Sequence, residues 1–129
     1  MTYTSKLYRI TQKRHHTANG KSLFRDVESM SDVRITVKRI TVYRDLMEVY
    51  ENPIEHACDM EEGMVFVSHD GHRPEGICDS AWETMEPFVS SLSRGEGDFF
   101  DGWMRDPLSA MVSCNDGFRP VSFYLETIR

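Results

Sequence analysis

Apolar and polar residues alternate from Val33 to Lys38, with valine or isoleucine at every second position. This period of two is typical of a β-strand that has one face against a core and the other in water. After Arg39 the apolar residues change phase, which predicts a β-bulge there. Antiparallel sheets tolerate one wet face, so the pattern favours a small, mostly antiparallel sheet.

One principal helix is predicted to pack on this sheet, because apolar residues recur at helical spacing over about residues 80–92. Ser80 and Glu83 have the spacing of a capping box, and Asp79 is an alternative cap. Pro87 lies inside the pattern and is expected to kink or interrupt the helix.

Shorter elements complete the predicted fold. Short helices are expected at about residues 22–30 and 46–50, and further strands at residues 64–67, 111–114 and 121–125. Asn115-Asp116-Gly117 is a hairpin signal that predicts a positive φ at Gly117. The predicted fold class is therefore α+β, with one principal helix packed on a small sheet.

Charge divides the 129 residues, a length typical of a single domain, into two parts. Residues 1–25 contain six basic and no acidic residues, whereas the rest of the chain has a net charge of −12. The sequence predicts a basic N-terminal arm over residues 1–32, with a short helix, and a single α+β domain over residues 33–129.

A basic arm on an acidic body can bind nucleic acid, fold against its own body or dock on an acidic partner. The acidic body repels phosphate, so nucleic acid is not the expected partner. We expect docking on a larger protein subunit, with packing on the chain's own body as the alternative. The candidate contacts in the arm are Lys6, Arg9, Lys13 and Arg14.

The Gly-rich stretch over residues 94–107 contains three aromatic residues, Phe99, Phe100 and Trp103. Such a loop either folds back over the core or offers a second surface for the partner.

No membrane contact is expected, because the longest apolar runs are too short to cross a bilayer. The N-terminal residues lack the apolar segment of a secretory signal, so the expected location is the cytoplasm. In that reducing compartment, three widely spaced cysteines do not form a disulfide framework.

Cys58, Cys78 and Cys114 each lie at the predicted end of an element, where side chains from separate segments can converge. Three thiolates and a fourth ligand, for which His72 is the candidate, suit zinc or an iron–sulfur centre. Because no Cys-x-x-Cys pair is present, two alternatives stay open. The cysteines can pack as small apolar residues, or Cys78 can be a nucleophilic or redox thiol beside a helix N-terminus.

Arg119 follows the predicted hairpin and could bind a carboxylate or phosphate ligand through two N–H groups. The alternative is a local ion pair. The sequence shows no catalytic pair of carboxylates, no Ser/His/Asp arrangement and no phosphate-binding glycine loop.

From Val33 to Ile128 the order of motifs resembles a family of short, functionally uncharacterised proteins of anaerobic bacteria and archaea. Three cysteines and a Cys-x-Asp-Gly-x-Arg-Pro-Val-x-Phe ending, here Cys114 to Phe123, carry the resemblance. The basic arm lies outside it, and Pro87 departs from the uninterrupted helix that it implies. The resemblance supports the fold and the importance of the cysteines, and it implies no activity.

Two classes of function follow. The first is a non-catalytic small subunit or accessory domain that docks on a larger enzyme of anaerobic metabolism, with a cysteine-ligated metal as an additional feature. The alternative is a stand-alone small metalloprotein, or a redox or thiol enzyme that uses Cys78.

Overall fold

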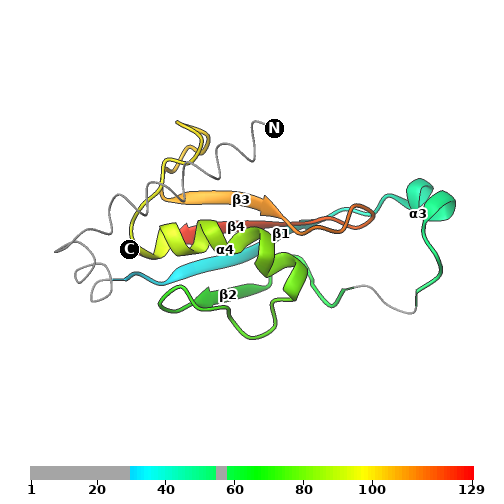
Figure 1. The fold of residues 1–129 in the computed structure, drawn as a ribbon, viewed down its shortest axis with the longest axis horizontal. Helices are drawn as coiled ribbons and strands as arrows, with labels where there is room; N and C mark the ends of the chain where they lie inside the picture. The colour runs from blue at the N-terminus through cyan, green and yellow to red at the C-terminus, as the bar shows by residue number, and fades with distance from the viewer. Residues whose placement is uncertain (1–29, 55–57) are drawn as a thin grey trace.

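The computed structural model describes residues 30–54 and 58–129 of the chain. Within them, four strands form one antiparallel sheet in the order β2-β1-β4-β3 (Figure 1). The strands are β1 (Val33–Ile40), β2 (Val65–Ser68), β3 (Ser109–Ser113) and β4 (Val121–Thr127), and the helices are α3 (Arg44–Tyr50) and α4 (Asp79–Ser93). The predicted α+β class is confirmed. Residues 1–29, which make up most of the predicted arm and of its short helix, lie outside the described residues.

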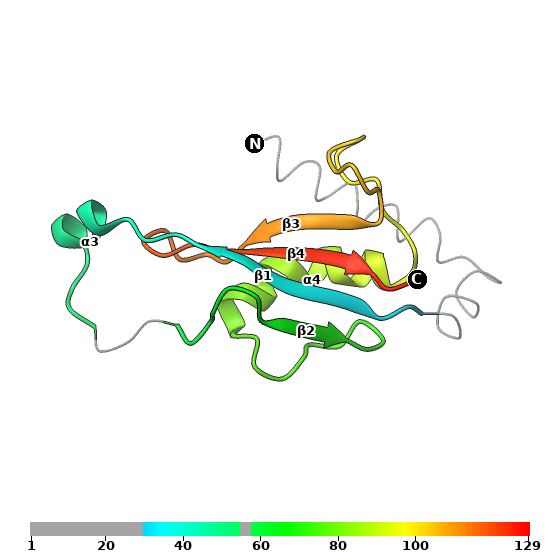
Figure 2. The same ribbon diagram turned by 180° about the vertical axis from the view of Figure 1, so that it is seen from behind.

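The two faces of the sheet follow from the alternation in β1. Val33, Ile35 and Val37 are at most 1% exposed, and β4 pairs Leu125 with Ile35 and Phe123 with Val37 on the same face. These side chains form one core with α4, which lies across this face of the sheet (Figure 1). Figure 2 shows the opposite face, where no described helix covers the strands.

The bulge predicted near Arg39 is confirmed, because the β1–β4 register shifts between Val37 and Arg39. On the uncovered face, Arg34 and Glu126 face each other across the two strands. Their guanidinium and carboxylate groups lie 3.4 Å apart and are partly exposed to solvent.

Helix α4 confirms the principal helix, and it continues through Pro87 without interruption. Its packing on the sheet therefore outweighs the hydrogen bond that proline removes. The predicted capping box is wrong. Cys78 is the N-cap residue and makes no side-chain cap hydrogen bond, while Ser80 Oγ accepts the backbone N–H of Asn115 at 3.3 Å.

The aromatic loop after α4 folds back onto the body. Its ends meet where the backbone N–H of Asp98 donates to the carbonyl of Pro107 at 2.7 Å. The ring of Phe99 packs edge-on against Phe88 with centroids 5.0 Å apart, and Phe99 is 2% exposed. Trp103 stays 37% exposed, so the loop covers the core and also leaves one aromatic side chain at the surface.

The predicted turn at Gly117 is wrong, because Gly117 is not among the glycines with positive φ. The β3–β4 connection is longer than a tight hairpin, and Asp116 shapes it instead. Its Oδ1 accepts the backbone N–H groups of Phe118 at 2.8 Å and Arg119 at 3.2 Å. A side chain that mimics a backbone turn in this way needs no left-handed residue at position 117.

Beyond the sheet, β1 and β4 continue as a narrow two-chain stalk of residues 41–43 and 118–120. Thr41 N–H donates to the Pro120 carbonyl and Tyr43 N–H to the Phe118 carbonyl. Helix α3 lies at the far end of this stalk, away from the body (Figures 1 and 2). No helix within residues 30–54 and 58–129 combines the length and the apolar character needed to cross a bilayer.

Candidate functional site: a pocket lined by three cysteines

The three cysteines line one pocket of about 270 Å³ at the end of the body from which the stalk leaves. The other residues of its wall are Asp59, Met60, Gly76, Ser80, Asp116, Arg119 and Val121. Cys58 and Cys78 are exposed, Cys114 is half-buried, and all three are free thiols. The three cysteines therefore share one pocket. The alternative of burial in the core is wrong for the exposed Cys58 and Cys78, whereas Cys114 packs against the core.

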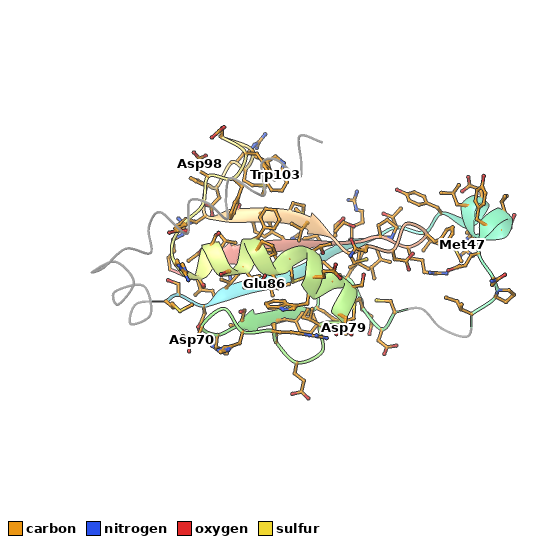
Figure 3. The ribbon with its side chains drawn as sticks, in the orientation of Figure 1. Met47, Asp70, Asp79, Glu86, Asp98 and Trp103 are labelled. Atoms are coloured by element: carbon orange, nitrogen blue, oxygen red, sulfur yellow. The ribbon has the colours of Figure 1, made fainter. Side chains whose placement is uncertain are left out.

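Cys78 is held at the start of α4. Its carbonyl accepts the first helical hydrogen bond, from Trp82 N–H at 2.9 Å. The guanidinium of Arg73 donates twice to the carbonyl of Ile77, at 2.9 and 2.6 Å, and fixes the residue before it. Arg73 also pairs with Asp79 at 2.6 Å, at the stalk end of α4 (Figure 3). This pair ties the first turn of α4 to the segment that precedes it.

Cys114 is tied both to β4 and to α4. Its N–H donates to the Val121 carbonyl at 3.1 Å, and its sulfur accepts the Val121 N–H at 3.4 Å. The next residue, Asn115, hydrogen-bonds to Ser80 twice, at 3.3 and 3.4 Å. The segments that bear Cys114 and Cys78 are therefore joined directly.

Cys58 approaches from a third segment. Its sulfur accepts the Met60 N–H at 3.5 Å, and the Met60 side chain packs against the core. Backbone N–H donors thus reach the sulfurs of both Cys58 and Cys114. These hydrogen bonds fix where the two sulfurs lie in the pocket.

Arg119 closes one side of the pocket, and its side chain is 13% exposed. One guanidinium nitrogen donates to Asp116 Oδ2 at 2.9 Å, and the other donates to Glu51 Oε1. Arg119 was predicted to bind a ligand, but the structure shows its guanidinium paired with two carboxylates of its own chain. The alternative, an ion pair within the chain, therefore describes Arg119 better than ligand binding does. Glu51, at the end of α3, had no signal in the sequence because it lies 68 residues from its partner.

The Arg119 network keeps Asp116 ionised. Burial raises the pKa of this carboxyl, but hydrogen bonds from the Phe118 and Arg119 N–H groups and the Arg119 guanidinium outweigh burial. The pKa of Asp116 is therefore lowered from its ordinary value of 3.8. Both carboxylate oxygens are already occupied by hydrogen-bond donors.

His72 was predicted to be a fourth metal ligand, but the structure places it elsewhere. It lines a separate pocket beside β2, with His69, Arg73 and Glu75. Within residues 30–54 and 58–129, no three His, Cys, Asp or Glu side chains form a ready-made metal site. The cysteines share a pocket without being drawn together into one coordination sphere.

The predicted partner contacts are only partly visible. The basic residues Lys6, Arg9, Lys13 and Arg14 lie outside the described residues. In the aromatic loop, Phe99 belongs to the core, whereas Phe100 is half-buried and packs edge-on against Trp103 at the surface.

We expect Arg119→Met to lower the melting temperature and to shift acid unfolding to higher pH. A carboxylate with a lowered pKa contributes stability above its unfolded pKa and loses it as pH falls through the folded pKa. Without the guanidinium the folded pKa of Asp116 rises, so this stability is lost at a higher pH. Melting curves between about pH 3 and 7 measure the shift. Arg34→Met, which removes a more exposed pair, is the control, and an equal effect of both substitutions would contradict the role of Arg119.

No protein-family model, curated protein or solved structure matches this chain.

Proposed function

We propose that the chain is a small metal-binding protein in which Cys58, Cys78 and Cys114 together hold one thiophilic metal centre, with Zn²⁺ as the first candidate and an iron–sulfur centre as the second. The observation that carries the proposal is that three free cysteines from three separate segments line one pocket of about 270 Å³. Soft thiolate ligands select zinc and iron–sulfur centres over hard cations such as magnesium or calcium.

Two of the three ligands are already held in place, since the Ser80–Asn115 hydrogen bonds join the segments of Cys78 and Cys114. Binding of the metal ion would bring the segment of Cys58 toward Cys78 and Cys114. The fourth position is left to water or to an external ligand, because the Asp116 oxygens are occupied and His72 lies in another pocket. Three protein ligands and an open position are the arrangement of zinc sites that bind a further molecule.

The proposal extends to location and assembly. Free thiols that bind metal require a reducing compartment, so we place the protein in the cytoplasm. An accessory role on a larger subunit is compatible with the metal site. Its support is the charge split of the sequence and the exposed Trp103. We rank the metal site first, because its three cysteines line one pocket.

Titration of the reduced protein with Co²⁺ should give one equivalent of binding and the intense absorption of cobalt–thiolate bonds. Replacing any one of the three cysteines by serine should weaken binding by about a hundredfold or more and diminish that absorption. His72→Ala is the matched control and should bind as the wild type does.

Two results would contradict the proposal. One is reduced protein that binds no metal ion. The other is binding that survives all three cysteine substitutions but is lost in His72→Ala. If no metal binds and only Cys78 reacts rapidly with an alkylating reagent below the usual thiol pKa of about 8.5, thiol chemistry at the exposed Cys78 becomes the better function.

A further inference from the structure

Exposed large apolar side chains gather at one place on the molecule. Of the nine such residues in the part of the chain that the structure describes, six lie within residues 42–54. These six, Val42, Tyr43, Leu46, Val49, Tyr50 and Ile54, are here called the apolar tip. Val49 is 71% exposed and Tyr50 is 75% exposed. A concentration of this kind marks an interaction surface more often than scattered apolar residues do.

Helix α3 gives the apolar tip a continuous face. Tyr43, Leu46, Val49 and Tyr50 are three or four residues apart, so their side chains lie along one side of the helix. Arg44 and Glu48 are about 160° to 200° away from Leu46 around the helix, so the apolar face contains neither of these charges.

The residue that follows α3 is tied back to the chain's own stalk. Met47 is half-buried and lies on α3 (Figure 3), and Glu51 at the helix end pairs with Arg119. Neither contact covers the apolar tip, whose residues stay exposed.

Helix α3 is too short to be stable by itself. It has seven residues, none of them buried, and isolated helices shorter than about 12 residues are marginal in water. A surface that covers the apolar face would add to the stability of the helix.

We propose that the apolar tip of one chain pairs with the apolar tip of a second copy, which gives a two-fold symmetric dimer. From the exposed fractions, each tip exposes on the order of 600 Å², so pairing removes at most about 1,200 Å² from water. This upper limit is at the lower end of what specific protein interfaces bury, roughly 1,200–2,000 Å².

The tip is also complementary to itself. In a two-fold dimer the same patch meets itself, so each residue must be compatible with its symmetry-related neighbour. If two α3 helices pair antiparallel about Leu46, Tyr43 lies opposite Val49 of the second copy, and Val42 lies opposite its Tyr50. Apolar residues then face apolar residues at the centre of the interface, and Asp45 lies at its edge.

The position of the tip allows this pairing. Because α3 stands at the end of the stalk (Figures 1 and 2), two chains can meet there while their bodies remain apart. The three-cysteine pocket lies at the base of the stalk and stays accessible in such a dimer. The dimer therefore does not depend on the proposed metal site.

Sedimentation velocity of the full chain, over a roughly hundredfold range of concentration, tests the proposal. We expect a species of twice 15.0 kDa. Leu46→Glu and Tyr50→Glu place charges in the interface, so each should raise the dimer Kd at least roughly tenfold. Glu48→Gln on the other side of the same helix should leave the Kd unchanged. All three variants should melt as cooperatively as the wild type, because α3 buries no residue.

A wild-type chain that stays monomeric at every concentration would overturn the proposal. So would a dimer that both Leu46→Glu and Tyr50→Glu leave intact, since it would use another surface. A monomer that binds a larger protein or a lipid vesicle through Tyr50 would also overturn it, and would assign the tip to that partner instead.

Discussion

Replacing Gly97 with alanine should lower the melting temperature by roughly 10 °C, which corresponds to about 3 kcal/mol for a domain of this size. A Cβ atom at position 97 would lie 2.1 Å from the backbone carbonyl oxygen of Pro107. The clash is with backbone, so no side-chain rotation relieves it. It would push apart the two ends of the aromatic loop, which the Asp98–Pro107 hydrogen bond joins, and would lift Phe99 from the core.

Gly117→Ala is the matched control. Position 117 has no positive φ, and a Cβ atom there would meet nothing within 4 Å. Alanine at this position should leave the stability of the folded protein unchanged or raise it by up to about 1 kcal/mol, because it lowers the conformational entropy of the unfolded chain. Thermal melts of the two variants provide the comparison. Equal losses of stability would show that the close approach at Gly97 does not constrain the loop.

Zinc should raise the melting temperature of the reduced protein by roughly 15 °C when free zinc is about 1,000 times its Kd. At that ratio the metal adds about 4 kcal/mol to the free energy of unfolding, provided that it binds only the folded chain. The effect is large because one ion would join three segments that are far apart in sequence. Cys58, Cys78 and Cys114 lie before β2, at the start of α4 and after β3.

The Cys78→Ser variant gives the control for this prediction. It should melt close to the metal-free wild type and gain little from zinc, because Cys78 is exposed and contributes little to the core. Differential scanning calorimetry with and without a chelator measures both effects. A zinc-induced shift of the same size in Cys78→Ser would place the metal elsewhere on the chain.

Features that depend on local periodicity could be predicted from the sequence. The alternation in β1, the bulge near Arg39 and the position of α4 all follow from which residues must face the core. That the three cysteines share one pocket agrees with their placement at element ends, where separate segments meet.

Features that depend on partners distant in sequence could not be predicted. Ser80 has capping-box spacing, but its hydroxyl binds Asn115, 35 residues away. The residues around Gly117 are typical of a tight hairpin turn, but hydrogen bonds of the Asp116 side chain to Phe118 and Arg119 shape the loop instead. The apolar pattern of α3 predicted a helix correctly. Periodicity does not show, however, that the stalk holds this apolar face away from the chain's own core.

The most direct test of the metal site is to count sulfur ligands by X-ray absorption at the zinc edge, in the zinc-loaded, full-length protein. A zinc site held by all three cysteines should show three sulfur atoms at about 2.3 Å and one lighter ligand at about 2.0 Å. Substitution of any one cysteine by serine should reduce the sulfur count. A zinc ion surrounded only by nitrogen and oxygen ligands, or by a single sulfur, would contradict the claim that the three cysteines act together.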